Sequence, residues 1–164
     1  AIAHFAGIDA EVIAKVLREF QGVEHRIELC NEIDGIRFVN DSKGTNPDAA
    51  IRAIEAMKRD IILIAGGYDK GASFDEFVNA FDGKVKALVL LGKTATKIKE
   101  AAEKAGFTNT VILKDMEACV REAYRLAESG DVVLLSPACA SWDMYTSFEQ
   151  RGEHFKACVR ELER

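Results

Sequence analysis

Residues 61–67 read Ile-Ile-Leu-Ile-Ala-Gly-Gly, a run of five apolar side chains that ends in two glycines. A strand with one exposed face alternates apolar and polar residues, whereas a strand buried on both faces is apolar throughout. Similar apolar runs follow at residues 87–91, 110–113 and 132–135. Because stretches with helical spacing separate these runs, the sequence predicts βαβ units in a parallel sheet.

Helix-start signals agree with this alternation. Asn46-Pro47 precedes a helical pattern over residues 49–57, and Ser73 with Glu76 three residues later forms a candidate capping box. Asp9 is suited to cap a helix that runs to about residue 20, since apolar residues recur there at helical spacing. We expect further helices at about residues 94–105, 116–128 and 152–162.

The segment before the first buried strand has a different pattern. Residues 26–33 and 36–40 alternate around Asp34-Gly35, a dipeptide suited to a two-residue hairpin turn. The sequence therefore predicts a Rossmann-like three-layer α/β domain, with a mostly parallel sheet and an N-terminal β-hairpin.

The same turn fixes an expected register. If Ile33 lies opposite Ile36, regular pairing places Arg26 opposite Lys43 and Glu28 opposite Asp41. Arg26 and Asp41 would then be diagonal neighbours on one face of the hairpin, within reach of an arginine–carboxylate contact.

Composition excludes several classes of function. The 164 residues carry 22 Lys and Arg against 27 Asp and Glu, so a net charge of -5 offers no general attraction to nucleic acid or anionic lipid. No apolar run approaches the roughly 20 residues of a membrane helix, and no secretory signal is visible, so we expect a cytoplasmic protein. The four cysteines lack metal-site spacing and are interpreted as reduced, mostly buried thiols.

Polar and glycine-rich segments follow the predicted strands. Ligands of open parallel sheets bind outside the carboxyl ends of the strands, and lysines, hydroxyls and glycines gather in these segments. Such an edge suits a small anion that carries carboxylates or phosphates. The alternative is that glycine, serine and asparagine are simply the residues of ordinary loops. The segments are residues 41–46, 66–71, 92–94, 114–115 and 136–141.

Several catalytic motifs fail on inspection. Gly92-Lys93-Thr94 resembles the end of a P-loop, but Ala87 stands where the first glycine is required. Cys139 and Ser136 are conceivable nucleophiles, yet no Gly-x-Ser-x-Gly elbow surrounds them. Trp142 is open to two interpretations, stacking on a ligand or serving as a half-buried anchor, and the second is the more common role.

Three segments carry a specific resemblance. Residues 40–47 read Asn-Asp-Ser-Lys-Gly-Thr-Asn-Pro, residues 135–143 read Leu-Ser-Pro-Ala-Cys-Ala-Ser-Trp-Asp, and residues 148–152 read Phe-Glu-Gln-Arg-Gly. Together they resemble the C-terminal domain of the D-glutamate-adding Mur ligases. Residues 1–23 look like the tail of that family's central ATP-binding domain, which implies that residues 24–164 form the C-terminal amino-acid-binding domain.

The resemblance implies a role within a larger enzyme of peptidoglycan synthesis. Such a ligase uses ATP and magnesium to convert the carboxylate of UDP-N-acetylmuramoyl-L-alanine into an acyl phosphate, which the amine of D-glutamate attacks. The family's P-loop and magnesium ligands do not occur in these residues, so we expect no catalytic or metal-ligating residue here. We also expect neither ATP nor magnesium to bind this chain alone.

The resemblance also implies which residues bind ligands, by matching positions of this sequence one at a time to the family's motifs. Those expected to bind the two carboxylates of D-glutamate are Thr45, Lys70, Ser141 and the backbone near Phe148. Those expected to face ATP when the domains close are His25, Arg26, Asp41 and Lys43. Two alternatives stay open: a sister ligase that adds another amino acid, and a non-catalytic α/β ligand-binding module.

Overall fold

A mixed six-stranded sheet forms the centre of the molecule. The computed structural model describes residues 2–20, 22–58 and 60–163. Within these ranges the strand order is β1-β2-β6-β3-β4-β5. All neighbouring strands are parallel except β1 and β2, which form the antiparallel hairpin at one edge. The strands are β1 (Glu28–Ile33), β2 (Ile36–Asn40), β3 (Ile61–Ala65), β4 (Val85–Leu90), β5 (Thr110–Ile112) and β6 (Val132–Leu135).

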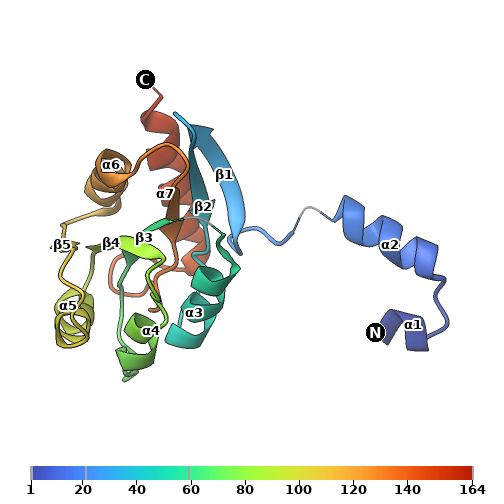
Figure 1. The fold of residues 1–164 in the computed structure, drawn as a ribbon, viewed down its shortest axis with the longest axis horizontal. Coiled ribbons are helices and arrows are strands. Elements are labelled where there is room, and N and C mark those ends of the chain that lie inside the picture. Colours follow the sequence, from blue (N-terminus) through green and yellow to red (C-terminus); the bar gives the residue numbers. More distant parts are fainter. Residues whose placement is uncertain (1, 21, 59, 164) are drawn as a thin grey trace.

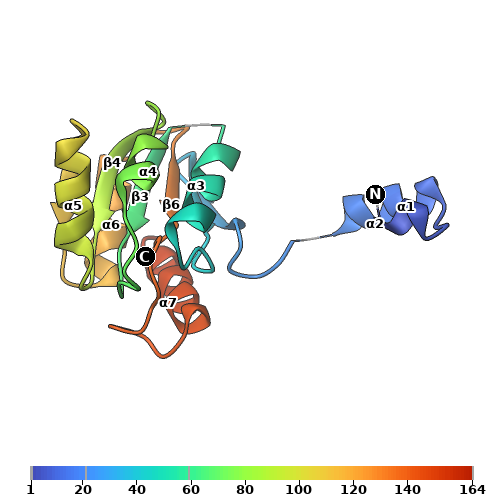
Figure 2. The ribbon, with the colours of Figure 1, turned by 90° about the horizontal axis from the view of Figure 1, so that it is seen from below.

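Helices cover both faces of this sheet: Figure 1 shows α6 and α7 on one side of the strands and α3, α4 and α5 on the other, and Figure 2 looks onto the second side. The apolar residues of α3, α4 and α5 pack on one face, and those of α6 and α7 pack on the other. Every residue of β3 and β6 is buried, as their continuous apolar runs predict. The three-layer prediction is confirmed. The helices are α1 (Ile2–Phe5), α2 (Ala10–Glu19), α3 (Pro47–Ala56), α4 (Asp75–Asn79), α5 (Ala95–Lys104), α6 (Met116–Leu126) and α7 (Phe148–Glu161).

Side-chain caps decide where several helices begin. The side chain of Asn46 accepts the backbone N–H of Ala49 at 2.9 Å, and Asp9 caps α2 as predicted. The predicted capping box at Ser73 is wrong: its hydroxyl binds the Asp75 carboxylate at 2.8 Å, and α4 begins after Phe74 without a side-chain cap. Helix α7 begins four residues earlier than expected because Ser147 caps it.

The hairpin register departs from the prediction beyond the turn. Ile33 faces Ile36 as expected, but an irregularity between Leu29 and Asn31 shifts the pairing by one residue. Glu28 consequently faces Asn40. This bulge consumes one extra residue of β1, which a regular two-residue periodicity cannot anticipate.

The prediction that Arg26 is a strand residue diagonal to Asp41 is therefore wrong, although the charge of Arg26 still lies close enough to favour a lower pKa of Asp41. Arg26 precedes β1, in a turn where His25 and Ile27 have positive φ angles of 61° and 47°. The Asp41 carboxylate instead accepts the backbone N–H of Ile27 at 3.3 Å and the hydroxyl of Ser136 at 2.7 Å. Asp41 is thus held inside the domain by a backbone group and a neutral side chain.

The N-terminal helices α1 and α2 extend away from the sheet (Figure 1). Neither helix buries a residue. The apolar stripe that predicted α2 is exposed: Val12, Val16, Leu17 and Phe20 are 52% to 70% accessible. Among the described residues, none of the helices has the length and apolar character needed to span a bilayer.

Candidate functional site

The loops that follow β3 and β6 are joined directly to one another. Tyr68 and Ala140 exchange backbone hydrogen bonds of 2.8 and 3.2 Å. Gly66 and Gly67 have positive φ angles of 113° and 141°. A Cβ atom on Gly66 would lie 2.1 Å from the Leu91 carbonyl oxygen, and one on Gly67 would lie 2.4 Å from that of Ala140. Only glycine permits this close approach, so the Gly-Gly pair is part of the site's architecture.

Arg151 fastens α7 to this edge of the sheet. Its side chain is 2% exposed, and its guanidinium donates to the Ser42 hydroxyl at 3.0 Å, the Ser42 carbonyl at 2.9 Å and the Cys139 carbonyl at 3.1 Å. Burial lowers the pKa of Arg151 to about 10, which leaves a cation at neutral pH. The sequence reasoning missed this residue, because helical spacing alone does not separate a buried arginine from an exposed one.

Two of the residues expected to bind D-glutamate line one hollow. Thr45 and Lys70 border a cavity of about 30 Å³, together with Asn46, Pro47, Tyr68, Asp69, Ala72, Phe74, Ala138 and Cys139. That volume is of the order of a single water molecule. A ligand of amino-acid size would therefore lie across the mouth of the hollow, where the exposed Lys70 stands.

Ser141 and Phe148 lie on neighbouring segments and do not line the hollow. Ser141 is 2% exposed, and its carbonyl accepts the backbone N–H groups of Met144 and Tyr145 at 3.1 and 2.9 Å. Phe148 is the first residue of α7, and its carbonyl accepts the Ser42 hydroxyl at 2.7 Å. The structure thus brings Thr45 and Lys70 together and holds Ser141 and Phe148 in the adjoining loop and helix.

The residues expected to face ATP lie on two segments in contact with each other. The backbone N–H of Lys43 donates to the His25 carbonyl at 3.0 Å. His25 and Asp41 are each 4% exposed, whereas Arg26 and Lys43 are exposed. Burial raises the pKa of Asp41, against the hydrogen bonds from Ser136 and the Ile27 backbone. Arg26 and Lys43 are therefore accessible to a ligand, and His25 and Asp41 support the segments that carry them.

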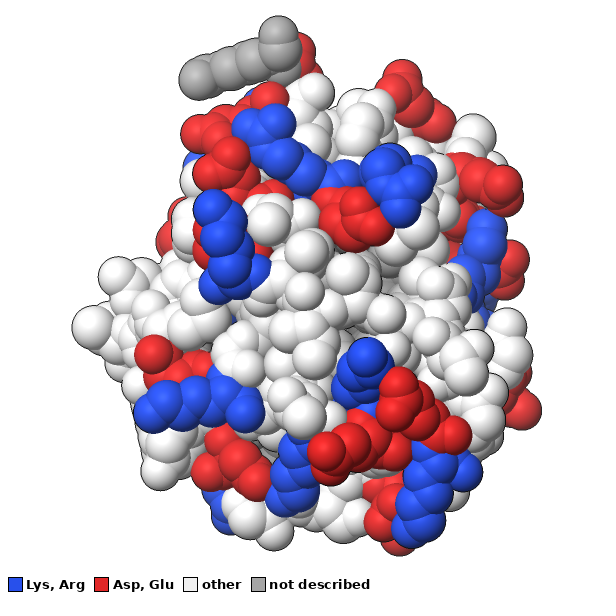
Figure 3. All heavy atoms as spheres, turned by 90° about the vertical axis from the view of Figure 1, so that its left-hand side faces the viewer, with Lys and Arg blue, Asp and Glu red and all other residues white. Residues whose placement is uncertain are grey.

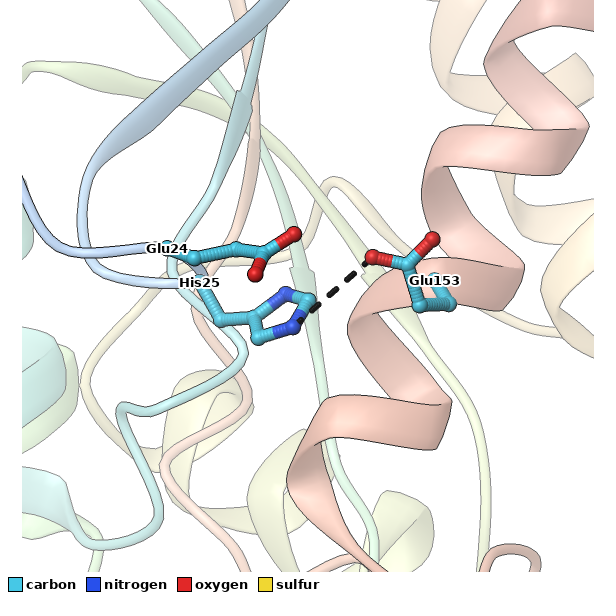
Figure 4. A group of neighbouring side chains, drawn as sticks. All are labelled: Glu24, His25 and Glu153. Atoms are coloured by element: carbon cyan, nitrogen blue, oxygen red, sulfur yellow. Dashed lines mark ion pairs between the residues drawn. The ribbon is translucent and has the colours of Figure 1, made fainter.

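In the described part of the chain, one group of side chains is spaced like the ligands of a metal ion (Figure 4). Ligand atoms of Glu24, His25 and Glu153 lie within 4.8 Å of one another. The ammonium of Lys156, however, lies 2.7 Å from both carboxylates. Burial alone would lower the pKa of Lys156, but hydrogen bonds to Glu153 and Glu24 outweigh it and hold this pKa above its ordinary range. A lysine thus already lies against both carboxylates and offsets part of their charge.

The conceivable nucleophiles are unsuited to that role. Cys139 is 3% exposed, and burial raises its pKa to about 11, so it is a neutral thiol at physiological pH. The hydroxyl of Ser136 is committed to Asp41. Three of the four cysteines are buried, as expected, and Cys30 is partly buried. Trp142, by contrast, is 63% exposed and is not the half-buried anchor that we considered more common.

Surface charge is mixed on the face that presents α5 and α6. Acidic and basic side chains alternate around an uncharged centre on that face (Figure 3). Such a surface has no extended region of one sign for a polyanion to follow.

Comparisons with known proteins agree on one family. The model of the Mur ligase, glutamate ligase domain family matches residues 25–139. The UDP-N-acetylmuramoylalanine--D-glutamate ligase of Thermoanaerobacter sp. strain X514 is 58% identical over 166 residues, covering 100% of this chain and 37% of that protein. The protein of the same name from Clostridioides difficile strain 630 is 56% identical, covering 99% of this chain and 36% of its own length. The chain thus spans somewhat over a third of these relatives.

Solved structures share the fold at low sequence identity. The UDP-N-acetylmuramate-alanine ligase of Thermotoga maritima superimposes with a TM-score of 0.70 at 15% identity, covering 98% of this chain and 36% of that one. A bifunctional folylpolyglutamate synthase/dihydrofolate synthase of Yersinia pestis, solved in complex with AMPPNP and a manganese ion, gives a TM-score of 0.62 at 16% identity. This second match covers 96% of this chain and 35% of the Yersinia pestis chain.

Proposed function

The chain belongs to the Mur ligase family, as a glutamate ligase domain, and we propose that it is the D-glutamate-binding part of a longer ATP-dependent ligase. In that role it presents the amine of D-glutamate to an acyl phosphate of UDP-N-acetylmuramoyl-L-alanine, a step of peptidoglycan synthesis. Positioning two reactants in this way can itself lower a barrier by about 7–11 kcal/mol. The names of the 56% and 58% identical relatives support D-glutamate as the amino acid.

One observation carries the proposal for this chain's own residues. Lys70 stands at the mouth of the Thr45 hollow, and no carboxylate of the described residues forms an ion pair with it. A dicarboxylate needs a cation and neutral donors, and the ammonium of Lys70 with the hydroxyl of Thr45 supplies both. Ser141 and the α7 start at Phe148 border the same edge, so we propose them as the partners of the second carboxylate.

ATP and a divalent cation belong to the proposed whole enzyme. The solved relative that holds AMPPNP and manganese supports their use in the fold family. In this chain the exposed Arg26 and Lys43 are the side chains available to approach a nucleotide when a neighbouring domain closes. His25 and Asp41 would act by fixing the two segments, since both are buried.

The proposed domain boundary follows the same reasoning. Residues 1–23 would form the tail of a preceding ATP-binding domain, and residues 24–164 the amino-acid-binding domain. The exposed apolar stripe of α2 supports this division, because apolar surface of that extent is normally covered by another part of a protein. A cytoplasmic location is part of the same proposal.

Phosphate release by the full-length protein tests the proposed function. The protein would be supplied with ATP, magnesium, UDP-N-acetylmuramoyl-L-alanine and one amino acid at a time. We expect D-glutamate to stimulate release, and L-alanine, L-lysine and diaminopimelate to leave it at background. Stimulation by one of the others would favour a sister ligase, and no stimulation by any amino acid would favour a non-catalytic binding module.

A further inference from the structure

Trp142 is a large exposed aromatic residue on the site's edge, and the turn that carries it is fixed. The preceding Ser141 is buried and its carbonyl closes the turn. The following Asp143 accepts the backbone N–H of Lys93 at 2.9 Å. The Tyr68 ring lies 5.8 Å from the Trp142 ring. An indole that is 63% exposed contributes little to the core, so its face is available to neighbouring side chains.

The Lys70 ammonium lies over the Trp142 ring. Its distance from the ring centroid is 5.0 Å, within the range of a cation–π interaction. Lys97 offers a comparison, since it lies 5.5 Å from the Phe74 ring but also pairs with the Asp69 carboxylate at 2.7 Å. Lys70 has no such carboxylate among the described residues, so the aromatic face is the contact that restrains its charged end.

We propose that Trp142 is a positioning residue for the amino-acid site: its indole face holds the Lys70 ammonium at the mouth of the hollow, ready to receive a carboxylate. This inference rests on the proposed function. A lysine stem loses rotational freedom when its ammonium binds an anion, and a stem already held by an aromatic face loses less. A carboxylate partner would also restrain Lys70, but it would compete with the ligand for the same charge.

The Tyr68–Ala140 hydrogen bonds make this arrangement possible. Lys70 and Trp142 belong to loops that follow different strands, β3 and β6, and each lies two residues beyond the bonded pair. The bridge therefore sets the distance between the two loops. The Asp69 carboxylate accepts the backbone N–H groups of Gly71 and Ala72 at 2.7 and 3.1 Å, which fixes the Lys70 backbone from the other side.

Substitutions of Trp142 distinguish the effect of its aromatic face from the effect of its side-chain volume. Trp142→Leu removes the face, Trp142→Phe keeps a weaker one, and Met144→Leu is a control on another exposed apolar residue of the same turn. An exposed cation–π contact corresponds to about a two- to fivefold change in affinity. In the full-length ligase we expect the KM for D-glutamate to rise about two- to fivefold in Trp142→Leu and less in Trp142→Phe. The KM for ATP should stay unchanged in all three.

A double-substitution cycle with Lys70→Met gives the decisive comparison. We expect Trp142→Leu to add no further rise in KM once methionine replaces Lys70, because the ring then has no ammonium to hold. In the 164-residue chain, the Lys70 side-chain protons should show an upfield ring-current shift that disappears in Trp142→Leu; this chain contains a single tryptophan.

The outcomes distinguish this inference from the function on which it rests. In one contrary outcome, Trp142→Leu raises the KM for D-glutamate equally whether residue 70 is lysine or methionine; in another, it raises this KM in neither background. Either result would overturn the positioning role and leave D-glutamate binding intact. An absent ring-current shift would do the same. An unchanged KM for D-glutamate in Lys70→Met alone would overturn the proposed site itself, and the role of Trp142 with it.

Discussion

Replacement of Arg151 by methionine tests whether this buried cation holds the site's edge together. Methionine fills a similar length of side chain but offers no donor. Its introduction takes away hydrogen bonds from the carbonyls of Ser42 and Cys139, both in buried residues. Each buried group left unsatisfied costs about 1–3 kcal/mol, which gives about 2–6 kcal/mol for the two carbonyls. Relief of the cost of burying a charge offsets part of this loss, so we expect a net destabilisation of about 2–4 kcal/mol.

Urea unfolding of the chain, followed by far-ultraviolet circular dichroism, measures this change. The control is Arg52→Met: the Arg52 side chain is 79% exposed and pairs with Glu55 at 2.8 Å on the surface of α3. An exposed pair of this kind contributes under about 1 kcal/mol. If Arg151→Met unfolds at the same urea concentration as the unsubstituted chain, the guanidinium does not support the two loops in the way that its hydrogen bonds indicate.

Three further predictions concern the site and its surroundings. In the full-length ligase, Lys70→Ala should raise the KM for D-glutamate about 10- to 150-fold, since a charge-assisted contact contributes about 1.5–3 kcal/mol. The control Lys114→Ala, on another loop that follows a strand, should leave this KM unchanged. Equal effects of the two substitutions would remove Lys70 from the site. Because burial raises the pKa of Asp41, the folded state binds its proton more tightly than the unfolded chain, so the unsubstituted chain should lose stability relative to Asp41→Asn as the pH rises from about 4. Parallel pH curves in urea unfolding would contradict this. The 164-residue chain should show no magnesium-dependent ATP turnover in a phosphate-release assay, because its sequence contains no phosphate-cradling loop, and turnover that disappears in Lys43→Ala would refute that prediction.

The sheet could be predicted because its strands are governed by burial. The bounds expected for β3 and β6 match the structure, since both strands are apolar from first residue to last. Caps were less predictable. Asn46 and Asp9 act as expected, but the Ser73 hydroxyl had a competing partner two residues away, in the Asp75 carboxylate. Local competition of this kind is invisible to a spacing rule.

The hairpin illustrates how a correct turn can still give a wrong register. Asp34 and Gly35 adopt the expected positive φ angles, and the pairing is regular for three residue pairs. The shift at Cys30 then moves Leu29 and Glu28 by one position, and Arg26 lies outside the strand, which begins at Glu28. A single inserted residue reverses which face a side chain occupies, so the predicted pairing of Glu28 with Asp41 failed although the turn was right.

The site was predictable from the resemblance more than from physical patterns. The segments after the strands indicated the sheet edge as the place for a ligand, but only the resemblance singled out both Thr45 and Lys70, which the structure brings to one hollow. Arg151 and Trp142 lie in segments that carry the resemblance, but neither approach predicted their contacts. Their roles depend on which loops meet in space, and the hydrogen bonds of Arg151 span more than a hundred residues of sequence to Ser42.

Amide NMR spectra of the 164-residue chain during a titration with D-glutamate test the central claim most directly. L-glutamate and D-alanine serve as comparisons, since one inverts the configuration and the other lacks the second carboxylate. The account predicts saturable shifts with D-glutamate that centre on Thr45, Lys70, Ser141 and Phe148, and weaker responses to the two comparison ligands. Shifts that centre elsewhere on the domain, or identical responses to all three amino acids, would contradict it.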